Sequence, residues 1–402
     1  MILGAVTPKN QKDLRSSLHP NTIKPILERV IEIIFESGLG EGIDVNDEVL
    51  TSLGAKSVSR EACLSKSDVL MSTSPISVDE ITAMKDKALF LGLMEPFSNK
   101  EQFSGFQLNN ISAVSMEFIP RITRAQKMDV LSSQSNLAGY VAVIESAKEL
   151  KSALPMMMTA AGTLKPATVF VIGVGVAGLQ AIATAKRLGA KVEAFDTRPV
   201  VEEQVKSLGA KFVKIDLGDT GQTEQGYANE LTKEQIQLQK DLQSEVCARS
   251  DIVITTAQLF GRPAPKLIDD KTIKKMKPGS VIFDMAVESG GNVEGSILDE
   301  INVINGVKVM GFSNLPSMDS DHASFALSNN FTNFISDFYC IEKKCIELDL
   351  EDEIIKFGKK FDPQYFHVDP KLSKASEYKG LIASGWHTCS VIMKLLCDKF
   401  LN

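Results

Sequence analysis

Residues 168–198 read TVFVIGVGVAGLQAIATAKRLGAKVEAFDTR. The apolar, β-branched residues 168–172 predict a buried parallel strand. Apolar side chains recur at helical spacing over residues 179–188, and residues 191–195 predict a second strand. A strand, a crossover helix and a second strand in about 30 residues are typical of a βαβ unit in a parallel sheet.

Three glycines between the first strand and the helix follow the pattern G-x-G-x-x-G, at Gly173, Gly175 and Gly178. In a dinucleotide-binding unit the first glycine permits a tight turn, the second lets the backbone approach a pyrophosphate, and the third lets the helix pack closely. Asp196 ends the second strand, where a carboxylate accepts hydrogen bonds from a ribose 2′-OH. This acid favours NAD(H), since it would repel a 2′-phosphate. We interpret Arg198, a mild signal for NADP(H), as a surface arginine.

The bulk composition limits the class of protein. A length of 402 residues predicts two or three domains, and a net charge of −7 argues against nucleic-acid binding. No run of 18 apolar residues predicts a membrane span, and the first residues predict a strand rather than a signal peptide. Six scattered cysteines without C-x-x-C spacing predict reduced intracellular thiols, and four distant histidines give no metal site.

The region before residue 134 alternates strands and helices, which predicts a parallel sheet. The predicted strands cover residues 2–6, 69–71, 89–93 and 114–118, and the predicted helices cover 25–34, 47–53 and a segment from Val78. The segment 120–140, PRITRAQKMDVLSSQSNLAGY, is unusually polar, and we predict a loop in which a helix resumes only at Leu137.

The central region predicts about six strands, the size of a complete dinucleotide-binding sheet. Met156–Met158 precede a short hairpin or loop, and we expect them to pack beneath the sheet. Residues 216–235 form a long polar segment with one aromatic, Tyr227, and such loops are often lids. From His322 to about residue 346 a helical pattern returns, which we expect to pack on the first region. The strands and helices predicted beyond the βαβ unit cover residues 211–215, 252–256, 280–285, 308–312, and 200–208, 234–248, 267–276.

Five segments together resemble the NAD(H)-binding component of proton-translocating NAD(P) transhydrogenase, a family related to alanine dehydrogenase. The resemblance covers roughly residues 1–346 and is strongest over 114–292. The segments are RITRAQKMDVLSSQSNLAGY (121–140), GVGVAGLQA (173–181), AFDTRP (194–199), GQTEQGYANE (221–230) and TTAQLFGRPAPKLI (255–268).

The resemblance implies an α/β fold of two Rossmann-like, doubly wound parallel-sheet domains with a cleft between them. Residues 1–133 plus 318–402 would form the first, partner-facing domain, and 134–317 the NAD(H)-binding domain. Such components form homodimers and pass a hydride from NADH to NADP⁺ on a separate subunit, while membrane subunits move protons. The chain would then lie in the cytoplasm or a matrix-like compartment, attached to the membrane through its partners.

The resemblance also assigns a nucleotide-orienting role to the polar segment. Arg121, Asp129 and Ser132 would hold NAD(H), and Gln126 would reach toward the partner's nucleotide. Direct hydride transfer needs two nicotinamides held in contact rather than an acid or base, so we predict that Gln126, Arg121 and Asp129 act by positioning. The alternative is that these side chains only satisfy backbone groups in a turn. The predicted coenzyme site further includes Val176, Ala177, Thr197, Gly261, Gly290 and the lid residue Tyr227. Tyr140 is expected to pack as a helix residue.

Two other functions compete. Alanine dehydrogenase uses a lysine and a histidine in its first domain, but the corresponding stretches here, MSTSPIS (71–77) and FLGLMEP (90–96), contain neither. Amino-acid dehydrogenation would therefore lack a proton donor. Arg15 matches that family's substrate arginine, and we interpret it as a surface residue. A non-catalytic, NAD-binding regulatory protein is the second alternative, and the divergent tail, residues 351–402, could be its partner dock.

Overall fold

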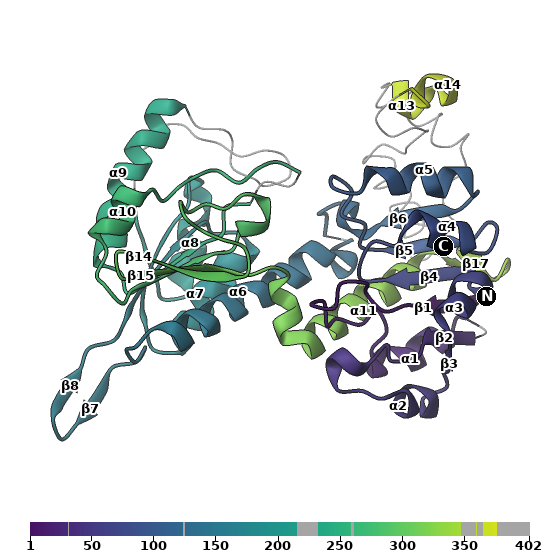
Figure 1. Ribbon diagram of the computed structural model, residues 1–402, viewed down its shortest axis with the longest axis horizontal. Helices are drawn as coiled ribbons and strands as arrows, with labels where there is room; N and C mark the ends of the chain where they lie inside the picture. Colours follow the sequence, from purple (N-terminus) through teal and green to yellow (C-terminus); the bar gives the residue numbers. More distant parts are fainter. Residues whose placement is uncertain are drawn as a thin grey trace. The chain divides into compact units, whose positions relative to one another are not determined.

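The computed structural model describes residues 1–346 except 31, 124, 215–231 and 259–260, together with residues 359 and 365–375. The chain divides into two compact units, Met1–Ser133 with Ser320–Asn402, and Gln134–Asp319. In each unit helices cover a sheet of mainly parallel strands (Figure 1). The predicted α/β class with two Rossmann-like domains is confirmed.

The first unit contains a six-stranded sheet in the order β3-β2-β1-β4-β5-β6, with every neighbouring pair parallel. This is the doubly wound order, in which the chain direction across the sheet reverses between β1 and β4. The strands are β1 (Ile2–Ala5), β2 (Glu32–Glu36), β3 (Lys56–Val58), β4 (Val69–Ser72), β5 (Leu89–Gly92) and β6 (Ser112–Ser115). The helices between them are α1 (Pro20–Leu27), α2 (Asp47–Ser52), α3 (Arg60–Lys66), α4 (Val78–Ala83) and α5 (Lys100–Leu108).

The predicted helix over residues 25–34 is wrong in its bounds. Helix α1 begins at Pro20, and Pro25 lies inside it rather than in its first turn. Ile33 and Phe35 belong instead to β2, where both side chains are fully buried against the neighbouring strands. A short apolar run fits a helix or a buried strand equally well, and pairing with β1 selects the strand. Strand β3 and helices α3 and α5 had not been predicted, and β6 ends at Ser115 rather than Phe118.

A long helix from the C-terminal part of the chain completes the first unit. Helix α11 (Ser320–Phe338) buries Leu327, Phe331 and Phe334 in the same apolar core as strands β1 and β2. Helical spacing places these side chains on one face, which explains why the helix packs here although it is distant in sequence. The helix then ends, and a two-stranded hairpin of β16 (Tyr339–Cys340) and β17 (Cys345–Ile346) replaces the predicted continuation to residue 346.

The second unit is built on a seven-stranded sheet in the order β11-β10-β9-β12-β13-β15-β14. Its first six strands repeat the doubly wound order, and β14 pairs antiparallel with β15 at one edge. The prediction of about six strands had missed β14. The strands are β9 (Thr168–Ile172), β10 (Lys191–Phe195), β11 (Lys211–Phe212), β12 (Ile252–Thr255), β13 (Val281–Asp284), β14 (Glu300–Ile304) and β15 (Val307–Gly311), and the helices are α6 (Val130–Glu149), α7 (Val176–Arg187), α8 (Glu202–Ser207), α9 (Lys233–Arg249) and α10 (Asp270–Lys275).

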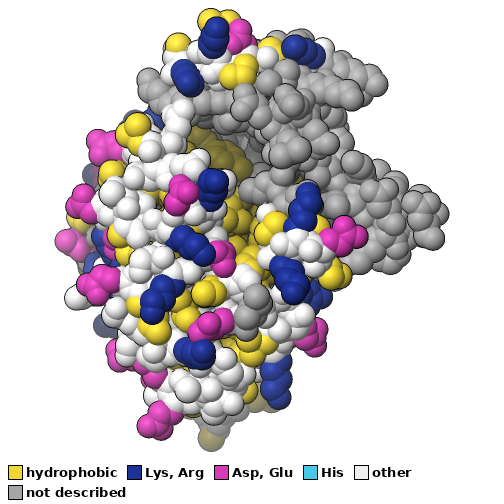
Figure 2. Space-filling view, turned by 90° about the vertical axis from the view of Figure 1, so that its right-hand side faces the viewer, with side chains coloured by type: hydrophobic (Ala, Val, Ile, Leu, Met, Phe, Trp, Pro, Cys, Tyr) yellow, Lys and Arg dark blue, Asp and Glu magenta, His cyan; other side chains and the backbone are white. Residues whose placement is uncertain are grey.

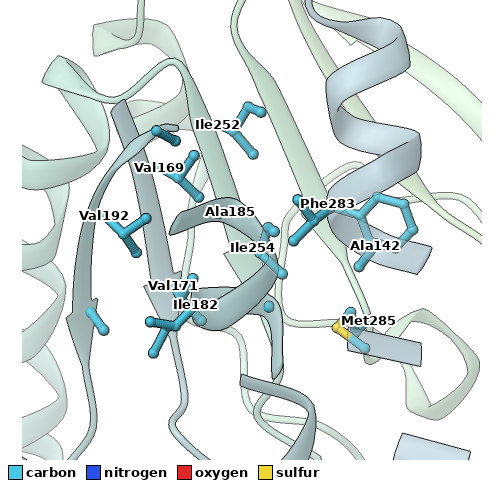
Figure 3. Close-up of a cluster of buried hydrophobic side chains, with 14 of the residues drawn as sticks. Ala142, Val169, Val171, Ile182, Ala185, Val192, Ile252, Ile254, Phe283 and Met285 are labelled. Atoms are coloured by element: carbon cyan, nitrogen blue, oxygen red, sulfur yellow. The ribbon is translucent and has the colours of Figure 1, made fainter. Parts of the chain in front are cut away.

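The core of this unit follows from the two-residue period of its strands. Val169 and Val171 of β9 point to one face of the sheet, where Ile254 of β12 and Ile182 of α7 meet them (Figure 3). Phe170 and Ile172 of the same strand point to the other face and join a second buried cluster. Because both faces are covered, β9 is a continuous apolar run, which is typical of central parallel strands.

A hairpin projects from the second unit. Strands β7 (Met157–Thr159) and β8 (Gly162–Leu164) pair antiparallel and extend away from the sheet (Figure 1). The expectation that Met156–Met158 pack beneath the sheet is wrong, since Met156 is 62% exposed and Met158 85%. The hairpin connects α6 to β9 and places its side chains in solvent within the unit.

Charged side chains of both signs cover the surface. Lys and Arg side chains are interspersed with Asp and Glu side chains on the face shown in Figure 2. Exposed pairs such as Lys56–Glu32, at 2.8 Å, contribute about 0–1 kcal/mol each. A more enclosed network surrounds Glu80, which caps α4 through Ser77 and accepts hydrogen bonds from Arg60 at 2.7 Å and Lys9 at 2.7 Å.

This network generates a pH-dependent prediction. Burial raises the pKa of Glu80, but the hydrogen bonds from Lys9, Ser77 and Arg60 outweigh it and lower the pKa from 4.5 to about 2. The carboxylate therefore stabilises the fold above pH 4.5, and this contribution disappears as the pH falls toward 2. Glu80→Gln should lower the free energy of unfolding at pH 7 by about 1–3 kcal/mol, and less at low pH.

Urea unfolding monitored by circular dichroism between pH 3 and pH 7 provides the measurement. Glu48→Gln is the control, because Glu48 occupies the first turn of α2 but is exposed. A Glu80→Gln deficit that stays constant across this pH range would contradict the assigned role of the carboxylate.

Candidate functional site

The glycine-rich loop lies where the chain direction reverses in the second sheet. Gly173 follows β9 with φ at 97°, and a side chain there would come within 2.5 Å of Thr256 Oγ1, just past β12. A Cβ on Gly178 would lie 2.0 Å from the Gly173 carbonyl oxygen. Thr256 Oγ1 also donates to that oxygen at 3.0 Å. These contacts explain why both positions are glycine, and they place the loop at the usual ligand site of a doubly wound sheet.

The middle glycine meets a different requirement. An added Cβ on Gly175 would have no atom within 4 Å, so the protein itself does not require a glycine there. Gly175 is the N-cap of α7 without a side-chain capping bond, and Val176 and Ala177 occupy the first turn. Backbone N–H groups in a first turn have no acceptor inside the helix and attract anions. The space and the donors together suit a pyrophosphate that approaches the backbone closely.

Asp196 and Arg198 form one hydrogen-bonded unit, and the interpretation of Arg198 as a surface arginine is wrong. The Arg198 side chain is 15% exposed, and its Nε and guanidinium nitrogen donate to the two Asp196 oxygens at 2.9 and 2.8 Å. Asp196 also accepts from the N–H of Val174 at 2.7 Å, and Arg198 donates to the Val174 carbonyl at 3.2 Å. The pair therefore fixes both backbone groups of the residue between the first two glycines, and Thr197 lies between its members.

The ion pair also determines the electrostatics at this strand end. The hydrogen bond to Asp196 raises the pKa of Arg198, although burial acts in the opposite direction. The guanidinium is therefore fully charged and offsets the negative charge of the Asp196 carboxylate. The acid at the end of β10 is thus a neutralised pair rather than an isolated charge, which residue spacing alone could not indicate.

A buried polar network, missed by the sequence reasoning, shapes the neighbouring loops. Asp284, at the end of β13, is fully buried and accepts from the N–H groups of Ala286, Asn292 and Val293 at 3.0–3.1 Å. The Asn292 side chain exchanges hydrogen bonds with both backbone groups of Ala257 at 2.9 and 3.1 Å. The position of an acid at a strand end was the available signal. The network joins the loops after β12 and β13.

Two predicted coenzyme residues lie on these loops. Gly290 has φ at 97°, and its carbonyl accepts from Lys266 Nζ at 2.6 Å. Gly261 also has a positive φ, 72°, and is exposed. The predicted lid residue Tyr227 lies outside the described residues.

The polar segment in the first unit brings three of its predicted residues together. Asp129 is buried and accepts from the Ser132 N–H at 2.9 Å and from Ser132 Oγ at 2.5 Å. Arg121 Nε lies 3.9 Å from Asp129 Oδ2. Gln126 begins a short 3₁₀ turn and is exposed. The predicted long loop is wrong, because α6 begins at Val130 rather than Leu137.

Helix α11 fastens this turn. Asn330 and Asn333 both donate to the Lys127 carbonyl, at 2.8 and 3.0 Å, and Lys127 Nζ pairs with Asp337 at 2.6 Å. Ser133 donates to the Asn330 side-chain oxygen at 2.8 Å, which fixes the orientation of that amide. The backbone around Gln126 is thus held by a helix that lies far along the chain from it. Tyr140, expected to pack, is 40% exposed on α6.

Arg15 is also not a surface residue. It is 9% exposed, and its Nε and guanidinium nitrogen donate to Asp13 at 2.8 and 2.9 Å. The Asp13 side chain is 4% exposed, so the pair is enclosed. The Arg15 carbonyl accepts from Thr73, one residue beyond β4, at 3.5 Å. The arginine therefore lies by the strand end at which the first sheet reverses, with a carboxylate of its own.

Two wider surveys concern the described residues alone. None of their His, Cys, Asp and Glu side chains form a group of three that could hold a metal ion. None of their helices has both the length and the apolar composition needed to cross a membrane.

The doubly wound sheets and the glycine-rich loop at a reversal point define a dinucleotide-binding protein of the NAD-dependent dehydrogenase class. Two family models match: "Alanine dehydrogenase/PNT, N-terminal domain" over residues 6–138, and "Alanine dehydrogenase/PNT, C-terminal domain" over residues 142–361. The chain therefore belongs to the alanine dehydrogenase/PNT family.

Individual relatives locate it further within the family. An NAD(P) transhydrogenase subunit alpha chain from Rhodospirillum rubrum is 44% identical over 85% of this chain and 91% of its own length. The crystal structure of transhydrogenase from Sinorhizobium meliloti matches with a TM-score of 0.75 and 39% identity, over 83% of this chain and 93% of that one. A solved L-alanine dehydrogenase, 20% identical with a TM-score of 0.72, covers 99% of both chains and shares the fold.

The C-terminal stretch resembles a different family. The model described as "MaoC like domain" matches residues 338–402 and overlaps the end of the C-terminal domain match. Most of this stretch lies outside the described residues.

The glycine contacts predict opposite outcomes for two substitutions. Gly178→Ala should lower the free energy of unfolding by about 1–3 kcal/mol, because its Cβ meets a backbone carbonyl. Gly175→Ala should leave stability unchanged but weaken NADH binding on the order of tenfold, because its Cβ occupies the space for the pyrophosphate. Thermal unfolding and NADH fluorescence titration separate the two effects. Unchanged NADH affinity in Gly175→Ala would show that the coenzyme does not approach this backbone.

Proposed function

We propose that this chain binds NAD(H) and passes a hydride between it and NADP(H) held on a partner subunit, coupled to proton translocation by membrane subunits. The observation that carries the proposal is the polar cluster of Asp129, Ser132 and Arg121 beside the exposed Gln126. The family, the glycine-rich loop of the second unit, and the transhydrogenase relatives support it.

The cluster suits a positioning role. Asp129 is oriented by two hydrogen bonds from Ser132, so its remaining acceptor capacity points in a fixed direction. Arg121 is 35% exposed in its side chain and can reach a ribose or phosphate oxygen while staying near Asp129. Gln126 presents an amide to solvent from a backbone that α11 holds rigidly. These groups would hold one nucleotide and meet a second.

Hydride transfer fits a site without an acid or base. NAD(H), when bound, supplies or accepts the hydride. The residues of this chain contribute by restricting the orientation of the nicotinamide and its ribose, since alignment alone lowers the barrier strongly. Asp196 with Arg198, Thr197, and the first turn of α7 would hold the adenosine end, while Gly261 and Gly290 line loops at the same sheet end.

The alanine dehydrogenase alternative loses its remaining support. Arg15 could have bound a substrate carboxylate, but the Asp13 carboxylate already occupies its guanidinium in an enclosed pair. A second carboxylate would have to displace Asp13 and leave that buried acid without its cation, which is costly. The strand ends at Ser72 and Gly92 supply no lysine or histidine either. We therefore propose no oxidation of small 2-amino acids.

The quaternary structure is part of the proposal. The exposed methionines of the β7–β8 hairpin, with Leu164 at 46% exposure, form an apolar arm unusual for a solvated hairpin. We infer that this arm packs against a second copy in a homodimer. The dimer would stay in the cytoplasm or a matrix-like compartment and attach to the membrane through partner subunits.

Reconstitution tests the function. The purified chain, mixed with the NADP-binding component of a transhydrogenase, should reduce an NADP⁺ analogue with NADH. The chain alone should bind NADH and should not oxidise alanine. Tight NADH binding without turnover in the mixture would contradict the catalytic role and favour a regulatory NAD-binding protein. Alanine oxidation by the chain alone would support the dehydrogenase instead.

Gln126 provides a sharper prediction within this assay. Gln126→Asn withdraws the amide by one methylene, which should slow hydride transfer on the order of 100-fold because the nucleotides are misplaced. NADH affinity should change by less than about threefold. Gln107→Asn, the same change on the exposed surface of α5, is the control. Equal losses in rate and NADH affinity would show that Gln126 only contributes to coenzyme binding.

A further inference from the structure

The hairpin after α11 places two cysteines directly opposite each other. Strands β16 and β17 pair antiparallel, with Tyr339 opposite Ile346 and Cys340 opposite Cys345. Opposed residues of an antiparallel pair direct their side chains to the same face of the hairpin. The four intervening residues form the turn, in which Lys344 adopts φ at 53°. The register therefore brings two thiols together that the sequence spacing, C-x-x-x-x-C, does not associate with a known motif.

The spacing of such a pair suits a disulfide. Opposed Cα atoms of antiparallel strands lie about 4.5–5.5 Å apart. Disulfides form across Cα separations of about 4.4–6.8 Å, so the two sulfurs can bond without a shift of the strands. Both thiols are free in the structure.

Accessibility separates this pair from the other described cysteines. Cys345 is exposed and Cys340 is partly exposed. Cys63 and Cys247 are buried, and burial raises the pKa of each thiol to about 12, so neither forms a thiolate at neutral pH. An oxidant in solution would therefore reach the hairpin pair selectively.

We propose that Cys340 and Cys345 are a reversible disulfide site, oxidised by small anionic disulfides of the glutathione class. The Cys345 thiolate attacks one sulfur of the small disulfide, whose S–S bond breaks and releases one small thiolate. The Cys340 thiolate then attacks the mixed disulfide and expels the second small thiolate. Two electrons pass from the protein thiols to the small disulfide, and their two protons go to the released thiolates. Lys343 and Lys344 place positive charge beside Cys345, which favours approach of an anionic reagent.

The location gives the bond a structural consequence. Tyr339 and Ile346 pack against the apolar core of the first unit, so the disulfide fixes both strands to it. The hairpin residues Tyr339, Ile341 and Lys344 line a hollow of about 400 Å³ with Glu28, Arg29 and Ser336. The hairpin follows the last turn of α11, in which Asp337 pairs with Lys127 of the nucleotide-orienting turn. Oxidation would thus fix one wall of the hollow at the end of the helix that holds Gln126.

The test treats the full-length protein with oxidised and reduced glutathione at a series of ratios. Acid quenching, alkylation of free thiols with N-ethylmaleimide, and peptide mapping without reduction then identify each cysteine. The expected result is a Cys340–Cys345 cross-link and complete loss of alkylation at both residues, restored by dithiothreitol. Cys63 and Cys247 should remain unmodified until the protein is unfolded.

Single substitutions make the test decisive. Cys340→Ser should leave Cys345 as a stable glutathione adduct, and Cys345→Ser should leave Cys340 unable to cross-link. Thermal unfolding of both variants checks that the fold is retained. The proposal is overturned if the two wild-type cysteines end as separate glutathione adducts, if either pairs with Cys389, Cys397 or another chain, or if both stay reduced.

Discussion

The close approach of backbone to backbone at the reversal point of the second sheet is the contact on which the candidate site depends. The first turn of α7 can lie against β9 only because Gly178 has no Cβ to meet the Gly173 carbonyl. Thr256, from the neighbouring strand end, caps the same carbonyl and excludes a side chain at Gly173. Once these three residues are in contact, the helix N-terminus faces open space beside Gly175. A phosphate-binding loop is thus a result of packing, in which absent side chains leave backbone N–H groups as the available donors.

Hydrogen-bonded pairs, rather than isolated charges, define the surroundings of the site. Asp196 is held by Arg198 and by the backbone of Val174, so the acid and the loop are ordered together. Asp129 is held in the same way by Ser132 in the first unit, and Asp13 by Arg15. Each carboxylate has donors before any ligand arrives, which limits the cost of its burial. The same arrangement explains why Arg15 is not available to a small carboxylate substrate.

Helix α11 shows how a distant segment completes a local one. The turn around Gln126 contains few apolar side chains and no long regular element of its own. Asn330, Asn333 and Asp337 supply the bonds that hold it, and their helix is anchored in the core by Phe331. The predicted packing of this helix on the first region is confirmed by those core contacts. Its asparagines could not have been assigned a partner, because nothing local to them indicates Lys127.

The amino-acid sequence by itself determined the βαβ unit, the positions of the three glycines and the α/β class, because strand and helix periods and missing Cβ atoms are local properties. Local patterns failed where one apolar run fits two structures, as at Ile33 and Phe35, where pairing with β1 selected a strand. Only the tertiary structure decided that Arg198 and Arg15 are enclosed, that Met158 is exposed, and that Asp284 and Asn292 join two loops. Burial and hydrogen-bond partners depend on residues brought together from distant parts of the chain, so no local pattern contains them.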